Sequence, residues 1–138
     1  MTKTRFFLAP LAAAALLSLA ACTSEAPAGA GAALPGMPKG NIAAGEQLAN
    51  AKGAATGQSC IDCHGADGNA PIDASYPRLG GQFGDYLAYA LRAYRDGTRD
   101  HALMSMQAQG LSDQQVADIS VYFASRDSQL RSLQGAHN

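Results

Sequence analysis

The chain has 138 residues, a formal net charge of −1, and hydrophobic side chains at 47% of its positions. This length favours a single domain. The charge balance argues against a nucleic-acid-binding protein, because such proteins gather lysine and arginine into a basic patch. We therefore expect no nucleic-acid partner.

The first 21 residues have the pattern of a secretory signal peptide. Lys3 and Arg5 precede an apolar run over residues 6–19, and small residues follow it. A basic start, a short apolar stretch and a small-residue end are typical of an export signal. The run is shorter than the roughly 18 residues of a membrane span, although an uncleaved anchor helix is an alternative.

The signal ends on Leu-Ala-Ala-Cys at residues 19–22, which resembles the lipobox of bacterial lipoproteins. The resemblance implies cleavage before Cys22 and a lipid on its thiol, and several acyl chains on one residue anchor a protein stably. An ordinary cleavage site with an incidental cysteine is the alternative. We expect an exported protein, lipid-anchored at Cys22 on the periplasmic side of a bacterial membrane.

Residues 22–41 are rich in Ala, Gly, Pro, Ser and Thr, a composition typical of a flexible tether between the lipid and a globular head. We expect the head to comprise residues 42–138. Its first helix should begin after Asn41, which is a good N-cap, with Ile42, Leu48 and Ala49 at helical spacing.

Residues 60–64 read Cys-Ile-Asp-Cys-His, the attachment signature of a c-type haem. The thiols of Cys60 and Cys63 would each form a thioether with the haem, and His64 would bind its iron. A thioredoxin-like pair needs a βαβ context, and a zinc site needs four ligands; neither is visible in the sequence. We predict one covalent haem c, and with Cys22 lipidated no cysteine remains for a disulfide.

The rest of the chain predicts two longer helices and two loops. Glycine and proline recur over residues 65–84, which predicts a long loop around the haem. A helix is expected over residues 85–96, capped by Asp85 and ended by Gly97, and a loop over 97–111. Ser112 and Gln115 form a capping box for a last helix, which we expect to end between residues 126 and 134. No segment alternates with period two, so the fold class is all-α.

Three side chains between the last two helices could bind the iron opposite His64. Met104 and Met106 offer thioethers, which are weak, soft ligands that raise the reduction potential. His101 is the alternative and would give iron bound by two histidines.

Four motifs give the chain a specific resemblance to class I c-type cytochromes, nearest to the single-haem halves of bacterial dihaem cytochromes. They lie in family order at residues 60–69, 76–82, 94–97 and 111–113, and the similarity covers about residues 42–126. The resemblance implies the class I cytochrome c fold, a few helices wrapped around one covalent haem.

The resemblance also assigns roles to single residues. In this family the sixth ligand lies seven residues before the leucine of Leu-Ser-Asp, which is Met104 here. The carbonyl of Pro77 would accept a hydrogen bond from the ring of His64, with Pro71 as a weaker candidate, and Leu79 would touch the haem. The first and last helices would cross where Gly45 faces an aromatic side chain, either Tyr122 or Phe123.

The predicted function is one-electron transfer, without catalysis and without a small-molecule substrate. Iron bound on both sides has no open position for a substrate. The expected partners are redox proteins that dock at the haem edge, together with the membrane that holds Cys22. Two alternatives are a haem subunit of a larger oxidoreductase and a haem peroxidase or gas-binding protein with a displaceable sixth ligand.

Overall fold

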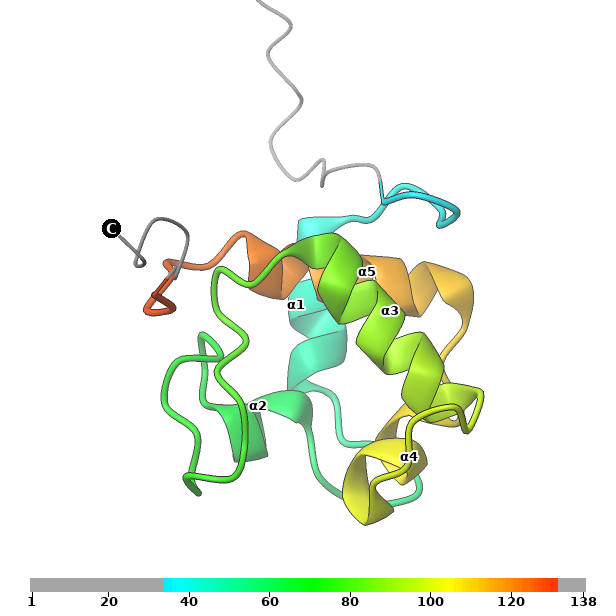
Figure 1. The fold of residues 1–138 in the computed structure, drawn as a ribbon, viewed down its shortest axis with the longest axis horizontal. Coiled ribbons are helices and arrows are strands. Elements are labelled where there is room, and N and C mark those ends of the chain that lie inside the picture. Colours follow the sequence, from blue (N-terminus) through cyan, green and yellow to red (C-terminus); the bar gives the residue numbers. More distant parts are fainter. Residues whose placement is uncertain (1–33, 132–138) are drawn as a thin grey trace, which may run out of the picture.

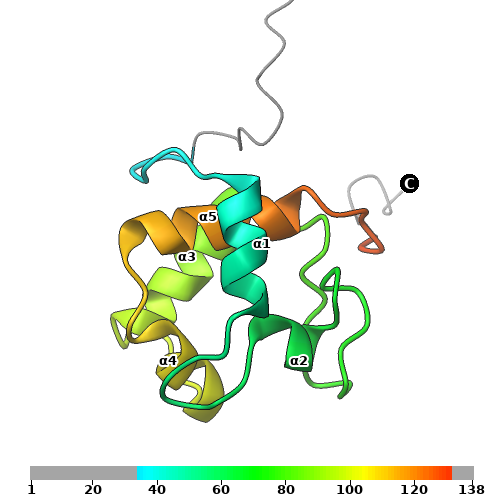
Figure 2. The same cartoon turned by 180° about the vertical axis from the view of Figure 1, so that it is seen from behind.

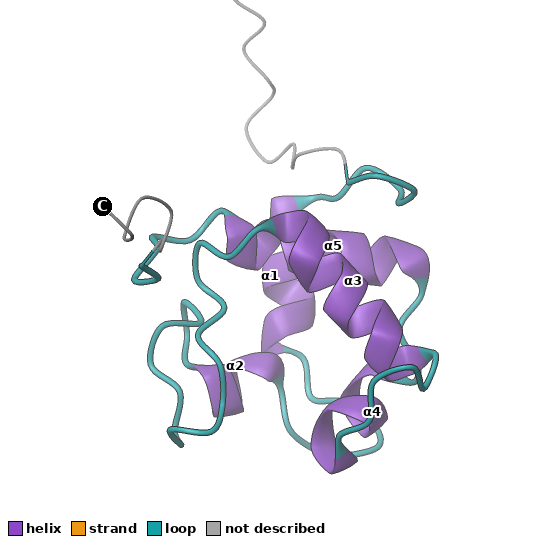
Figure 3. Ribbon diagram, viewed as in Figure 1, coloured by secondary structure: helices purple, strands orange, loops and turns teal. Residues whose placement is uncertain are grey.

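The computed structural model describes residues 34–131, which form five α-helices and, within that range, no β-strand. Figure 3 shows long loops between the helices. The predicted all-α class is therefore confirmed. The predicted signal peptide, Cys22 and residues 22–33 of the predicted tether lie outside the described residues, as do residues 132–138.

The helices are arranged around the last of them. Figures 1 and 2 show α5 between α1 on one side and α3 on the other, while α2 and α4 lie at the opposite end, well apart. Within the described range, no helix is long and apolar enough to cross a membrane. The helices are α1 (Ile42–Asn50), α2 (Cys60–His64), α3 (Gly84–Arg95), α4 (Ala102–Ala108) and α5 (Asp113–Ala124).

Helix α5 forms the centre of the core. Its predicted capping box is present, because Ser112 accepts a hydrogen bond from the Gln115 N–H while the Gln115 side chain accepts one from the Ser112 N–H. Every residue from Val116 to Phe123 is buried, since neighbours cover several faces of the helix. Leu34 and Gly40, in the last part of the predicted tether, also lie against this core.

The crossing of α1 and α5 depends on Gly45. A Cβ atom there would lie 2.0 Å from the carbonyl oxygen of Asp118 and 2.7 Å from Cβ of Tyr122. The predicted contact of Gly45 with an aromatic residue is thus confirmed for Tyr122. Asn41 caps α1 as predicted, and its N–H donates to the buried carboxylate of Asp118 at 2.7 Å.

Helix α3 differs from the prediction at its start. It begins at Gly84, its N-cap is Phe83, and no side chain caps it. Asp85 therefore lies inside the first turn, where its carboxylate accepts a hydrogen bond from the adjacent Tyr86 N–H instead. The predicted cap was wrong, but Gly97 ends the helix as predicted, in the left-handed conformation with φ 74°.

The loop predicted over residues 97–111 contains a helix, α4, so that prediction was wrong. Its residues, Ala-Leu-Met-Ser-Met-Gln-Ala, are mostly good helix formers. The N-cap is His101, whose ring nitrogen accepts a hydrogen bond from the Met104 N–H. The last helix is shorter than predicted and ends at Ala124.

Candidate functional site

Helix α2 is a single short helix built around the two cysteines. Ser59 is its N-cap, and Ser59 and Asp62 bond reciprocally in a capping box. Side chains three positions apart in a helix lie on one face, so the fold presents Cys60 and Cys63 together. Within the described range both are free thiols.

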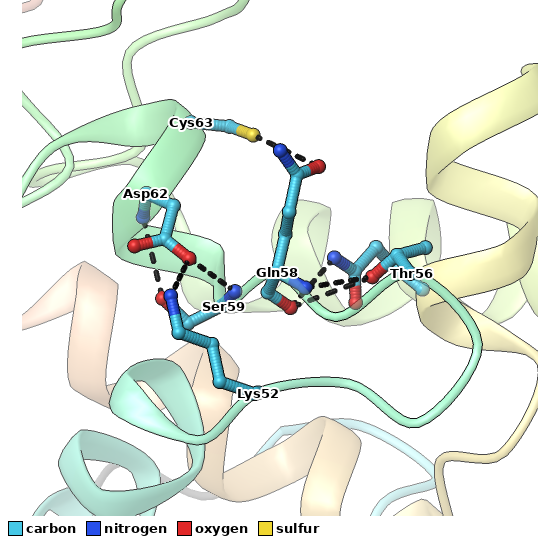
Figure 4. A network of polar contacts seen from close by, with 7 residues as sticks. Lys52, Thr56, Gln58, Ser59, Asp62 and Cys63 are labelled. Carbon is cyan, nitrogen blue, oxygen red and sulfur yellow. Dashed lines mark hydrogen bonds and ion pairs between the residues drawn. The ribbon is translucent and has the colours of Figure 1, made fainter.

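A polar network holds this helix from outside (Figure 4). Lys52, which follows α1, pairs with the carboxylate of Asp62, and the same carboxylate accepts the Ser59 N–H at 2.7 Å. The hydrogen bond from Lys52, followed by those from Ser59, lowers the pKa of Asp62 to about 2. Asp62 therefore stays ionised over the whole neutral range and fixes the start of α2.

The two thiols have different surroundings. Burial raises the pKa of the Cys60 thiol to about 11, so this thiol is protonated at neutral pH. The Cys63 thiol is directed to the side-chain oxygen of Gln58, 3.9 Å away. Neither thiol is cross-linked to another described cysteine, so both are free to form thioethers.

His64 ends α2 with its ring buried and one nitrogen already used. Nδ1 lies 2.9 Å from the carbonyl oxygen of Pro77, which can only accept a hydrogen bond. Nδ1 therefore carries the hydrogen, and the other nitrogen, Nε2, keeps a free lone pair. Burial lowers the pKa of His64, with the bond to Pro77 acting the other way. The neutral imidazole is the form that binds metals.

Helix α5 holds the loop that carries Pro77. The hydroxyl of Tyr122 donates to the carbonyl of Ala66 at 3.1 Å, and the Gly81 N–H donates to the carbonyl of Phe123 at 2.9 Å. Inside the loop, the Leu79 N–H donates to the carbonyl of Gly68 at 2.7 Å. The loop is thus fastened to the core on both sides of Pro77.

Two further residues named from the sequence lie in or beside this loop. Leu79 is partly buried and, like Cys60, packs against the core cluster that contains Phe123. Pro71 makes no hydrogen bond to His64 within the described structure, where Pro77 occupies that role. The roles of these residues toward a haem remain predictions.

The candidate sixth ligands lie on or beside α4. Met104 is partly buried, whereas Met106 is 42% exposed. His101 caps α4 through Nδ1, so this nitrogen is already engaged in a structural hydrogen bond. The structure thus brings Cys60, Cys63, His64 and Pro77 together directly, and places Met104 on a separate helix at the same end of the molecule (Figures 1 and 2).

This set of groups fits a haem attached through two thioethers. Two thiols share one helix face, and the histidine that follows them has Nδ1 hydrogen-bonded, while its Nε2 has no hydrogen bond to the part of the chain that the structure describes. Among residues 34–131, no cluster of three or more His, Cys, Asp or Glu side chains could hold a metal ion without such a cofactor. The two thiols and the histidine are the groups that a covalently attached haem requires.

Comparison with known proteins also indicates a covalently attached haem. The pattern of the cytochrome c family matches residues 42–127, and the chain belongs to that family. It therefore carries one covalently bound haem c, attached in the Cys-x-x-Cys-His segment that contains Cys60 and Cys63. The predicted class I cytochrome c fold and the predicted cofactor are both confirmed.

The similar proteins differ in length. The chain is 49% identical to cytochrome c-554(548) of Halomonas halodenitrificans over 50% of its own residues and 86% of that protein. It is 47% identical to the thiosulfate dehydrogenase electron acceptor of Thiomonas intermedia, over 48% of this chain and 30% of that one. Cytochrome c4 from Pseudomonas stutzeri superposes with a TM-score of 0.54 at 29% identity, over 62% of this chain and 48% of that one.

The chain thus spans nearly all of one relative and less than half of the other two. This agrees with the predicted resemblance to one half of a bacterial dihaem cytochrome. Membership of this family supports electron transfer by a c-type haem.

Sequence reasoning missed the elements that hold the site in place. Helix α4 and its His101 cap lack the usual serine, threonine or aspartate start signal. Lys52 bonds to Asp62 across the turn after α1, and no local sequence pattern predicts this contact. The run of helix-forming residues between Gly97 and Gly110 was the available signal for α4.

Proposed function

We propose that this protein is a one-electron carrier whose haem iron is bound by His64 on one side and by Met104 on the other. Bound haem supplies reversible one-electron chemistry, and an imidazole with a thioether raises its reduction potential. With both axial positions filled by the chain, no position is open for a substrate. Leu79 would contact the haem face from the loop.

The observation that carries the proposal is the ring of His64. Its Nδ1 is fixed on the carbonyl of Pro77 and its Nε2 is free, so the ring has one tautomer and one orientation before any metal binds. Such a hydrogen bond orients a metal-binding histidine and raises its basicity. Because burial lowers the pKa of His64, protons compete weakly for the same nitrogen.

The partners in this proposal are other redox proteins. The Thiomonas relative is named as an electron acceptor of thiosulfate dehydrogenase, which supports a docked redox partner for this chain as well. We place the protein on the periplasmic side of a bacterial membrane, held there by a lipid on Cys22. The division into a signal peptide at 1–21, a tether at 22–41 and a haem domain at 42–138 belongs to the same proposal.

A second candidate is a haem subunit of a larger oxidoreductase. It is favoured by a different relative, which is named as the cytochrome subunit of a sulfide dehydrogenase. Purification from detergent extracts separates the two: a free carrier elutes alone, whereas a subunit elutes with a flavin, molybdenum or second haem protein at constant ratio.

The test of the proposal is the optical spectrum of the protein matured in a host competent for cytochrome c assembly. We expect a low-spin ferric spectrum with the weak red band of sulfur-bound iron, and no rapid binding of carbon monoxide by the ferrous form. A high-spin ferric spectrum with rapid carbon monoxide binding would instead support a peroxidase or gas-binding protein. A colourless product would refute haem attachment altogether.

A further inference from the structure

Helix α4 carries Met104 but is weakly connected to the half of the site that contains the cysteines. It packs against α3 and against no other described helix. Helix α2, which holds Cys60, Cys63 and His64, packs against α1 instead. Some other contact must therefore fix the distance between the methionine and the cysteines in the absence of the cofactor.

One side-chain hydrogen bond makes this connection. The amide nitrogen of Gln107 donates to the carbonyl oxygen of Gln58 at 3.0 Å, across 49 positions of the chain. Among the hydrogen bonds of residues 34–131, it is the one that joins α4 to the segment before α3. Gln107 lies three residues after Met104, on the adjacent turn of the same side of α4. Gln58 lies two residues before Cys60.

The acceptor is itself held in place. The carbonyl of Gln58 also accepts the Gly53 N–H at 2.9 Å, and the Gln58 N–H donates to the hydroxyl of Thr56 at 3.2 Å. Figure 4 shows Thr56 and Gln58 bonded in this turn, next to the Ser59 and Asp62 pair that starts α2. Gln107 therefore bonds to a fixed point of the cysteine segment and not to a loose loop.

The fold also leaves space for the Gln107 amide. A Cβ atom on Gly53 would lie 2.5 Å from Oε1 of Gln107. Gly53 is not in the left-handed region, so its backbone conformation does not require glycine. The missing side chain at Gly53 therefore permits the close approach of the amide.

We propose that Gln107 is a positioning residue that holds Met104 at the iron by fastening α4 to the carbonyl of Gln58. This inference rests on the proposed ligation by Met104. With haem attached and Met104 bound to its iron, the connections would run in a closed loop from the iron through Met104, Gln107 and Gln58 to Cys60. Opening it at Gln107 leaves the haem attached through its thioethers but lets α4 move away with its thioether.

The test is the affinity of the ferric protein for added imidazole, which competes with the methionine for the iron. In Gln107→Glu a carboxylate oxygen replaces the donor and faces the Gln58 carbonyl, so we expect imidazole to bind about threefold tighter or more, as the loss of one hydrogen bond implies. The matched control is Gln109→Glu, which makes the same change on an exposed side chain two residues away and should leave the affinity unaltered.

A pair of variants at Gly53 supplies a test that adds no charge. Gly53→Ala should tighten imidazole binding in the parent protein, because the new methyl group displaces the Gln107 amide. The same substitution in a Gln107→Ala background should have no further effect, because the amide it displaces is gone. Equal effects of Gly53→Ala in both backgrounds, or identical affinities for Gln107→Glu and Gln109→Glu, would overturn the proposal.

Met104→Ala separates this inference from the assignment on which it depends. If Met104→Ala abolishes the red band of sulfur-bound iron while the Gln107 and Gly53 variants bind imidazole like the parent, the ligand is right and the role of Gln107 is wrong. If the red band survives in Met104→Ala, the ligand assignment itself is wrong.

Discussion

The backbone of Asp118 passes so close to Gly45 that a Cβ atom there would lie 2.0 Å from the Asp118 carbonyl oxygen. Neither backbone can retreat easily, because the carboxylate of Asp118 accepts the N–H of Asn41 at the start of α1 and the side-chain amide of Gln114. The contact fixes the distance between α1 and α5, and therefore the frame on which the site is built.

We expect Gly45→Ala to lower the free energy of unfolding by more than about 2 kcal/mol, since forced overpacking at a close contact costs this much. Urea unfolding of the haem-containing protein, followed by circular dichroism, would measure it. Gly110→Ala is the control, because a Cβ there meets no atom within 4 Å. Equal stability of the two variants would contradict the assigned packing.

Replacement of Met104 should change the axial ligation of the haem iron without unfolding the protein. We expect Met104→Ala to lose the red band of sulfur-bound iron, to bind carbon monoxide when reduced, and to have a lower reduction potential, because a thioether favours the ferrous state. Spectra and redox titration would measure these effects. Met106→Ala, at a 42% exposed position, should resemble the parent protein. The reverse result would assign the sixth position to Met106.

Because Asp62 is paired with Lys52 at the start of α2, the free energy of unfolding should depend on pH in the acid range. The pKa of Asp62 falls from an ordinary value of 3.8 to about 2 in the folded protein. Between these values the unfolded chain binds more protons, so the stabilisation present above pH 3.8 is lost as the pH falls toward 2.

Asp62→Asn should therefore weaken the decline of stability between pH 4 and pH 2, and should leave the protein slightly less stable at neutral pH. Unfolding titrations at several pH values would show this. Asp100→Asn removes the same charge from an exposed carboxylate without a hydrogen-bond partner among the described residues, and should keep the steeper decline. An unchanged pH profile in Asp62→Asn would exclude the pair as its cause.

The proposed lipid on Cys22 predicts where the protein is found. Cys22→Ser should release it from the membrane fraction into the soluble periplasmic fraction, because no acyl chain can then be attached. Thr23→Ala leaves the cysteine in place and should stay membrane-bound. Mass spectrometry of the mature protein would report signal removal, acylation and haem attachment together, and a mature Cys22 without acyl groups would refute the anchor.

Local signals in the sequence predicted the helices whose ends carry a capping side chain or a terminating glycine. The capping box of Ser112 and Gln115, the N-cap Asn41 and the glycine after α3 all act within one turn, so their patterns can be read from neighbouring residues. Cys60, Cys63 and His64 likewise lie within five residues, and their spacing alone indicates a c-type haem. These features account for the helical class and for one half of the site.

Elements that depend on distant or unusual partners were not predictable in this way. Helix α4 is capped by a ring nitrogen of His101, and ordinary start signals do not include histidine. The N-cap of α3 has no side-chain bond at all. The bond from Gln107 to Gln58 joins a side chain to a backbone carbonyl, and any exposed glutamine in the sequence has the same appearance.

The C-terminal end of α5 contacts both the hydrophobic core and the loop that carries Pro77. Phe123 lies in the core, and its carbonyl holds the Gly81 N–H of the loop that presents Pro77 to His64. The aromatic ring of Phe123 also lies against Gly68 of the same loop. The packing of the Phe123 ring and the position of the loop that carries Pro77 are consequently linked in this molecule. Substitutions of Phe123 should therefore change the unfolding temperature and the redox midpoint together.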